Sequence, residues 1–298
     1  MTSEISAAQP TQTTWGQGRR LEFLDFRLHW DGRINRSALT DFFNISVPQA
    51  SLDISKYLEL APGNAVYDRS SKVYQATANF QPYFPNNVPE RYLNELLAIE
   101  TDIIRPEQSF IGWRPPVAAV PTPVRSVPDR TLIGLLSAIR DKTKVIIRYQ
   151  SMTTTEPSSR LISPHAIAND GFRWHVRAYC DQREKFIDFV IARILEISVT
   201  DVPGADSAND QGWNRVVKLV LCANPALAEG HRRVIELDYG MTDGVIELNC
   251  RQALLYYALK RLGLHKFDSD VARPEKQQIA LKNYAEVKKF LPRSDAPR

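Results

Sequence analysis

The sequence has no run of 18 uncharged apolar residues, so we expect no membrane-spanning helix. Residues 1–18 have neither a basic start nor an apolar core, and they read as a polar tail rather than a signal peptide. Cysteine is scarce: Cys180, Cys222 and Cys250 lie far apart, with no CxxC pair. An odd number of cysteines without a disulfide framework predicts reduced thiols and a cytoplasmic protein.

Motifs of catalysis and metal binding are also missing. The sequence contains no nucleophile elbow, no HxxxH, no carboxylate pair at helical spacing and no P-loop. We therefore expect no enzyme, no cofactor and no metal site. The net charge is only +4, from 38 basic and 34 acidic residues, so any binding of a polyanion must come from local patches.

Two breaks divide the 298 residues, a length typical of two or three domains. Proline removes a backbone donor and fixes φ, so a cluster of prolines excludes a helix or a central strand. Residues 101–128 therefore form a proline-rich connector, and a polar, Gly/Asp-rich segment at 201–212 is the second break. The resulting domains are 15–100, 129–200 and 213–298. The prolines of the connector are Pro106, Pro115, Pro116, Pro121, Pro123 and Pro128.

The first domain reads as three short helices followed by a hairpin. Leu21, Leu24 and Leu28 have helical spacing, Asn35 can cap a helix over 36–43, and Ser46 can cap one over 47–60. Two β-rich runs then flank a polar tip at 68–72. This order is that of a winged helix-turn-helix. For the third helix we expect four buried side chains, Leu52, Ile54, Tyr57 and Leu58.

The winged-helix pattern predicts binding to double-stranded DNA, because a helix fits the major groove. Residues 15–80 carry 8 basic and 7 acidic side chains, so binding would depend on a dimer. A small helical domain that docks a protein is the alternative. The candidate base-reading residues are Gln49, Ser51 and Lys56, and the candidate phosphate contacts are Arg36, Ser37, Arg69 and Lys72.

The second domain has the pattern of a small β-barrel with a helix before it. Residues 145–150 form a strand, Pro164 makes 160–167 an edge or a bend, and residues 169–171 form a hairpin turn. The next strand alternates cleanly. One face holds Trp174, Val176, Ala178 and Cys180, and the other holds Arg173, His175, Arg177 and Tyr179.

Arginines on strands suggest a second site. If Arg160 and Arg193 converge on the face of Arg173, His175 and Arg177, they form a concave anion site. His165 and Tyr179 would add rings suited to a nucleotide or a short single strand. The equally open alternative is a solvated face whose arginines pair with acidic neighbours, namely Asp181, Glu184 and Asp188.

The segment 146–197 resembles a WYL domain. The matching features are the strand IIRYQ, the Arg160-Leu161-Ile162-Ser163-Pro164 run with His165, the tripeptide Trp174-His175-Val176, and the segment 189–194. The resemblance implies a Sm/SH3-like small barrel that senses a nucleic-acid or nucleotide ligand. Relatives often carry arginine where this sequence has Ile187. By position the ligand contacts would be Tyr149, Arg160, His165, Arg173, Trp174, Arg177 and Arg193, although Trp174 also fits the core.

Residues 213–298 alternate strand and helix twice, which favours a compact α/β lobe. The whole architecture, an α+β multidomain chain, resembles the CapW/BrxR group. The resemblance implies a homodimeric transcription factor, mostly a repressor, that binds an inverted-repeat operator beside a bacterial anti-phage defence operon. It would use the third domain for dimerisation. An activator of the same architecture and a nucleic-acid-sensing adaptor remain alternatives.

Overall fold

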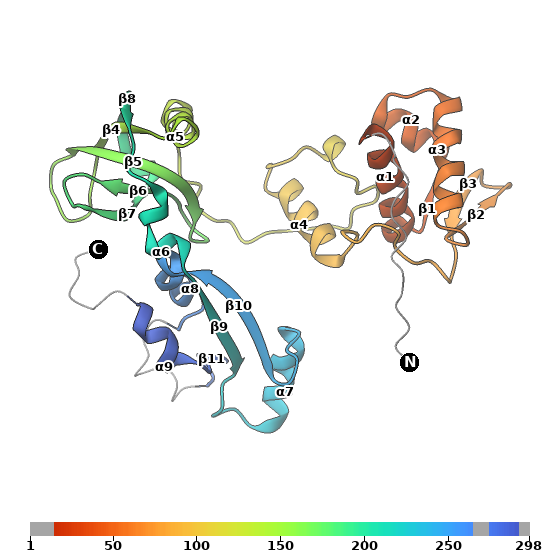
Figure 1. Cartoon of the computed structure of the whole chain (residues 1–298). Helices are drawn as coiled ribbons and strands as arrows, with labels where there is room; N and C mark the ends of the chain where they lie inside the picture. The colour runs from red at the N-terminus through yellow and green to blue at the C-terminus, as the bar shows by residue number, and fades with distance from the viewer. Residues whose placement is uncertain (1–14, 265–273, 292–298) are drawn as a thin grey trace, which may run out of the picture. The chain divides into compact units, whose positions relative to one another are not determined.

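The computed structural model describes residues 15–264 and 274–291 (Figure 1). The chain divides into two compact units, Met1–Thr122 and Pro123–Arg298. Most of the predicted polar tail, residues 1–14, lies outside the described residues. No helix within the described ranges is both long and apolar enough to cross a membrane.

The first unit is a winged helix-turn-helix, as the sequence predicts. Its helices pack beside a small antiparallel sheet of order β1-β3-β2. The elements are α1 (Trp15–Asp31), β1 (Arg33–Ile34), α2 (Arg36–Phe43), α3 (Val47–Leu60), β2 (Ala65–Asp68), β3 (Val73–Ala76), α4 (Pro89–Glu100) and the short η1 (Pro106–Gln108).

Local capping fixes where the two central helices begin. The side chain of Asn35 accepts a 2.9 Å hydrogen bond from the backbone N–H of Ala38. Ser46 accepts one from the N–H of Gln49 at 3.4 Å, and Pro48 occupies the first turn of α3. Both caps satisfy N–H groups that a helix leaves unpaired, and both confirm the predicted helix boundaries.

The predicted burial of Leu52 in α3 is wrong. Its side chain is 64% exposed, whereas Ile54 and Tyr57 are fully buried against α1. The buried stripe of α3 runs through Ala50, Asp53, Ile54 and Tyr57. These positions are spaced i, i+3, i+4 and i+7, so they share one face, and Leu52 lies on the opposite one.

Part of the proline-rich segment belongs to the core of the first unit. Phe110 and Ile111 are buried there, and the ring of Phe110 packs edge-on against Phe23 with centroids 5.2 Å apart. Residues 118–128 carry no helix or strand until α5 begins. The segment therefore anchors on the first unit before it becomes a linker.

The second unit contains a five-stranded antiparallel sheet of order β7-β6-β5-β4-β8, covered by α5 (Figure 1). Its strands β7 and β8 are edges, with no pairing between them among the described residues, so the sheet is open and the expected closed barrel is not confirmed. The elements are α5 (Asp129–Asp141), β4 (Thr143–Tyr149), β5 (Ser158–Asn169), β6 (Trp174–Cys180), β7 (Lys185–Val190), η2 (Ile191–Arg193) and β8 (Ile194–Pro203).

Two residues of this sheet can be compared with the sequence-based expectation. β5 is an inner strand, but its pairing with β4 ends at Ile162, so Pro164 is paired only with Ala178 of β6. The ladder shifts register between Pro164 and Ala166, which is the bend that the sequence predicts as one of two possibilities at this proline. Trp174, for which the alternation also allows a core position, is 55% exposed.

The remainder of the second unit is a smaller sheet of order β10-β9-β11 with a core of its own. In Figure 1, α7 lies at one end of the long β9–β10 hairpin, and α6 and α8 lie at the other. The elements are η3 (Ser207–Asn209), α6 (Gln211–Asn214), β9 (Val216–Ala223), α7 (Glu229–Asp238), β10 (Val245–Arg251), η4 (Gln252–Leu254), α8 (Leu255–Arg261), β11 (Ile279–Leu281), α9 (Tyr284–Val287) and η5 (Lys288–Phe290).

Candidate functional site

The candidate base-reading residues lie on the flanks of α3. Gln49 donates through Nε2 to Asp53 Oδ1 at 3.1 Å, Ser51 donates back to the carbonyl of Val47, and Lys56 pairs with Glu59 at 3.2 Å. All three side chains are half-buried. The exposed positions of the helix are Val47, Pro48, Leu52, Ser55 and Glu59, which the sequence analysis did not select.

Asp53 is a residue that sequence reasoning missed. Its carboxylate is completely buried and accepts from Arg20 Nε at 2.6 Å, from Gln17 at 3.3 Å and from Gln49. A buried carboxylate needs such donors, because desolvation penalises an unpaired charge. Asp53 thereby fixes the side chain of Gln49 relative to α1. Its position on the apolar stripe of α3 was the available signal.

The candidate phosphate contacts lie at the start of α2 and at the tip of the hairpin. Arg36 and Ser37 are exposed in the first turn of α2, and Arg69 and Lys72 are exposed at the β2–β3 turn. The carboxylate of Asp68 shapes this turn by accepting hydrogen bonds from the side chain of Ser71 and the N–H of Ser70. The same bonds lower the pKa of its carboxyl. Within the described residues, the side chains of Arg69 and Lys72 have no ion pair, so both are available to an anion.

The residues predicted to bind a ligand gather around three carboxylates in the second unit. Arg177, only 8% exposed, donates through Nε to Asp210 Oδ2 at 2.7 Å and through a terminal nitrogen to Asp210 Oδ1 at 3.0 Å. A further bond of 3.1 Å joins it to Asp188 on the neighbouring strand β7. Burial lowers the pKa of Arg177, but the two carboxylates outweigh it and raise that pKa overall.

The histidines of the cluster bind the same carboxylates or a third one. His165 Nε2 lies 3.0 Å from Asp210 Oδ2, and His175 Nε2 lies 3.0 Å from Asp170 Oδ2. Asp170 also accepts from Arg173 Nε at 3.0 Å. Every one of these basic side chains therefore already has an acidic partner within the chain.

The other candidates stand apart from this cluster. The hydroxyl of Tyr149 accepts from the backbone N–H of Val190 at 3.2 Å. Arg160 donates only to the carbonyl of Ser159, and no side-chain partner of Arg193 occurs among the described residues. Of the acidic neighbours that the alternative reading named, Asp188 pairs with an arginine, whereas Asp181 pairs with Lys144.

Asp210 is the second residue that sequence reasoning missed. It lies in the polar segment that the sequence marks as a break, 33 positions beyond Arg177, and it is 1% exposed. Its Oδ1 also accepts from the N–H of Trp213, so it caps the four-residue helix α6. The local signal was an aspartate directly before a possible helix start.

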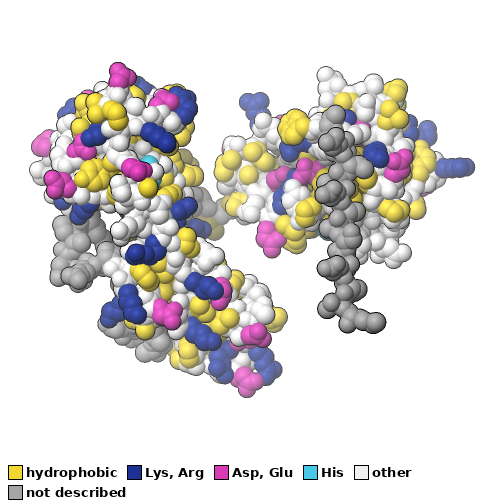
Figure 2. Space-filling view, viewed as in Figure 1, with side chains coloured by type: hydrophobic (Ala, Val, Ile, Leu, Met, Phe, Trp, Pro, Cys, Tyr) yellow, Lys and Arg dark blue, Asp and Glu magenta, His cyan; other side chains and the backbone are white. Residues whose placement is uncertain are grey.

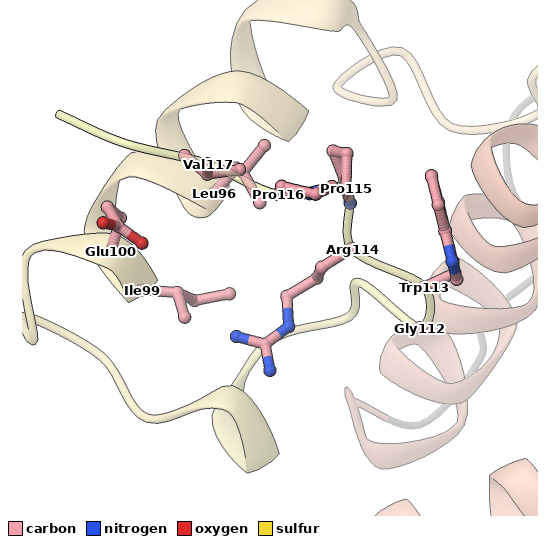
Figure 3. Close-up of a pocket in the computed structure, with 9 residues that line it drawn as sticks. All are labelled: Leu96, Ile99, Glu100, Gly112, Trp113, Arg114, Pro115, Pro116 and Val117. Atoms are coloured by element: carbon pink, nitrogen blue, oxygen red, sulfur yellow. The ribbon is translucent and has the colours of Figure 1, made fainter.

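A cavity of about 440 Å³ lies in the first unit between α4 and residues 112–117 (Figure 3). Its polar side chains are Glu100 and Arg114, and Arg114 points toward Ile99 in Figure 3. None of the candidate site residues lines it. In the described ranges, no three His, Cys, Asp or Glu side chains are placed to hold a metal ion.

Charges of both signs are distributed over the visible surface. Figure 2 shows basic and acidic side chains intermixed on the first unit, and basic side chains with acidic ones among them over the part of the second unit that contains β9, β10 and α7. The first unit therefore presents separate basic points rather than a continuous basic face in this view.

Three family models match the chain, one for each sequence-predicted domain. Residues 16–98 match the BrxR transcriptional regulator winged helix-turn-helix domain, and residues 130–199 match the WYL domain. Residues 216–287 match the BrxR transcriptional regulator C-terminal dimerization domain. The last match begins six residues after Asp210.

Relatives extend over almost the entire chain. A protein of Escherichia coli (strain KTE188) named DNA-binding transcriptional repressor CapW is 49% identical over 277 residues, which are 92% of this chain and 91% of the relative. A Pseudomonas aeruginosa protein of the same name is 46% identical over 93% of this chain and 92% of its own length.

Among solved structures, proteasome accessory factor B/C (PafBC) of Arthrobacter aurescens matches 98% of this chain at 15% identity, with a TM-score of 0.26. The chain spans about half the length of that structure, 51%. So low a TM-score carries no argument about the fold.

Proposed function

The chain belongs to the CapW/BrxR family of DNA-binding transcriptional repressors, and we propose that it represses transcription as a homodimer on an inverted-repeat operator. The main support for this proposal is the geometry of the first unit. It combines a capped helix α3 that has an exposed outer face with a hairpin whose tip carries two exposed basic residues, Arg69 and Lys72.

In this proposal α3 enters the major groove, where base pairs are distinguished by their donor and acceptor patterns. Gln49 has its amide group fixed by Asp53, which leaves its Oε1 to accept from an exocyclic amino group of adenine. Ser51 and Lys56 flank it. Arg36, Ser37, Arg69 and Lys72 contact phosphates and set the position of the helix.

Dimerisation supplies the affinity that one nearly neutral winged helix lacks. Residues 216–287 match a dimerization domain, and a symmetric dimer presents two α3 helices to two half-sites. Such half-sites lie about 34 Å apart, or a multiple of that, along the DNA.

We further propose that the WYL domain binds a nucleic-acid or nucleotide effector and that the regulated genes are an anti-phage defence operon. Supporting the first part, Arg177, Arg173, His165 and His175 are gathered in one cluster of the second unit. We propose as well that the five-stranded sheet is of the Sm/SH3-like small-barrel type and that the protein is cytoplasmic.

Fluorescence anisotropy with the upstream DNA of the chain's own gene tests the repressor assignment. We expect preference over a shuffled duplex of the same length, and an affinity that falls steeply between 50 and 200 mM salt by about 10³-fold or more. Equal affinity for both duplexes at every salt concentration contradicts the proposal. In a promoter reporter, deletion of the gene is expected to raise expression, and a fall would indicate an activator instead.

Arg177→Ala tests the effector site separately. A short single strand should release wild-type protein from the operator and leave the variant bound. If the variant binds the operator and is released by the single strand as the wild type is, Arg177 is not part of the effector site.

A further inference from the structure

Arg177 is bound by Asp210 in the manner in which guanidinium groups bind phosphate. The two bonds, 2.7 and 3.0 Å, join two nitrogens of one guanidinium to the two oxygens of one carboxylate. A phosphate group offers two oxygens at similar spacing, and arginine binds both anions through the same fork. His165, 3.0 Å from Asp210 Oδ2, would be a further donor to such an anion.

The two carboxylates that face Arg177 are anchored differently. Asp188 lies on β7, in register with Arg177 on β6, so the sheet ladder holds it in place. Asp210 lies between the three-residue η3 and the four-residue α6, outside any sheet. Elements this short are at the low-stability end of a fold. Asp210 is therefore the partner that can leave without breaking the sheet.

Charge requires that one of them leave. Arg177 provides one positive charge against two carboxylates, so an incoming phosphate would meet a site that already has an excess of negative charge. With Asp210 displaced, Arg177 and His165 would regain free donors, while Asp188 would still orient the guanidinium.

Aromatic rings surround the same point. The ring of His165 lies edge-on to Trp213, with centroids 5.8 Å apart, and to Phe186 at 5.5 Å. Tyr179 packs on Phe186 at 5.2 Å. Since Trp213 belongs to the helix that Asp210 caps, movement of Asp210 would uncover rings on which a base can stack.

We propose that Asp210 is an internal substitute for a phosphate group, which an effector bearing a phosphate and a base must displace from Arg177 and His165. This inference rests on the effector site proposed above and adds its regulation. Asp210 competes with the effector, so it sets the concentration at which the site responds. Its departure uncaps α6, and the dimerization domain begins directly after α6.

Substitution of the carboxylate alone tests the competition. Asp210→Asn keeps the size of the side chain and the oxygen that caps α6, but it removes the charge that holds Arg177. The probe is a thymidine tetranucleotide with a 5′-phosphate and a 3′-fluorophore, and its Kd is measured by anisotropy with the full chain. We expect the variant to bind at least about tenfold more tightly than wild type, the change expected for loss of about one charged hydrogen bond. An unchanged or weaker affinity overturns the proposal.

Asp206→Asn is the matched control, because Asp206 caps η3 in the same segment through Ala208 and does not touch Arg177. It should leave the Kd unchanged. If it tightens binding as much as Asp210→Asn does, loosening of the segment is responsible and the proposal fails. Two further probes locate the recognised group, namely the same tetranucleotide without its 5′-phosphate, and inorganic pyrophosphate. If Asp210→Asn tightens binding only of probes that carry a terminal phosphate, the site recognises the end of the chain. If it tightens binding of the tetranucleotide with and without the 5′-phosphate, the site recognises the phosphodiester.

A second measurement needs no variant. The N–H of Trp213 donates to Asp210 Oδ1 at 3.1 Å, and the N–H of Asn214 donates to the backbone carbonyl of Asp210 at 2.9 Å, a bond that the cap supports. The probe should accelerate hydrogen exchange at these two amides in wild-type protein, and equal or slower exchange in the presence of bound probe contradicts displacement. Both readouts are independent of operator binding. A chain that binds no operator yet shows these changes disproves the repressor assignment and leaves the competition intact.

Discussion

The hydroxyl of Tyr57 donates a 2.8 Å hydrogen bond to Asp25 Oδ1, and both side chains are fully buried. The bond joins α3 to α1. Asp25 also accepts from the backbone N–H of Tyr83 at 3.0 Å and from Asn87 at 2.9 Å, which ties the segment after the hairpin to the same point. The helix proposed to read DNA is thus held by a buried carboxylate rather than by apolar contacts alone.

Tyr57→Phe should destabilise the first unit by about 2 kcal/mol, because it removes a hydrogen bond to a buried charged group. Hydrogen exchange at the slowest amides of α1 and α3 measures the change. Tyr67→Phe serves as the control, since Tyr67 lies exposed on β2 and should shift the same amides by less than about 0.5 kcal/mol. Equal effects of the two substitutions would contradict a special role for the Asp25 contact.

The second prediction concerns Leu52 and Ile54, two branched aliphatic residues of α3 that the sequence predicts to be buried and of which only Ile54 is. Leu52→Ser should leave the unfolding free energy within about 0.5 kcal/mol, because the side chain is 64% exposed. Ile54→Ala should cost about 2–5 kcal/mol, because it opens a cavity in the core. Urea denaturation compares them. On DNA, Leu52→Ser should weaken operator binding by about tenfold through loss of an apolar contact with thymine methyl groups.

Helix α3 shows what the sequence can and cannot predict. The caps at Asn35 and Ser46 depend on atoms three residues apart, so the local sequence pattern predicts where α2 and α3 begin. Burial depends on which face meets α1. Apolar residues lie on both sides of α3, and the polar Asp53 occupies the buried stripe, so hydrophobicity alone predicts the wrong side for Leu52.

The candidate site shows the same limit more clearly. The alternation of β6 correctly placed Val176, Ala178 and Cys180 in the core, since a strand fixes which side each residue takes. It did not indicate that the opposite face is covered too. Arg177 and His175 are buried there by Asp210 and by Tyr257, residues 33 and 82 positions away from them. Such pairings arise from tertiary packing and leave no periodic signal in the sequence.

The third prediction tests a close backbone approach in the proline-rich segment. A Cβ at Gly112 would collide with the side chains of Asp31 and Arg27, which form an ion pair at the end of α1. Those atoms are the ends of the two side chains, so the ion pair must shift, and Gly112→Ala should destabilise the first unit by about 1 kcal/mol. Gly230→Ala is the opposite case, because a Cβ there meets nothing within 4 Å inside α7. It should be neutral or stabilising by up to about 1 kcal/mol. Differential scanning calorimetry of the two variants decides between these signs.

The last prediction follows from the titration of Asp170, which joins His175 and Arg173 in the second unit. Burial by itself raises the pKa of this carboxyl. Hydrogen bonds from His175 and from the backbone amides of Phe172 and Arg173 outweigh burial and lower the pKa to about 2 from an ordinary 3.8. A carboxyl whose pKa is lower in the folded state stabilises that state fully above its unfolded pKa. The contribution of Asp170 to the free energy of unfolding should therefore be constant above about pH 4 and disappear as the pH falls toward 2.

Thermal unfolding of wild type and Asp170→Asn across this pH range measures that contribution as a difference in Tm that narrows with acidification. The exposed Asp141, whose pKa is lowered chiefly by the side chains of Arg140 and Ser137 at the surface, is the control, and Asp141→Asn should change Tm far less. A difference for Asp170→Asn that stays constant down to pH 2 would mean that the loss is one of packing and not of charge.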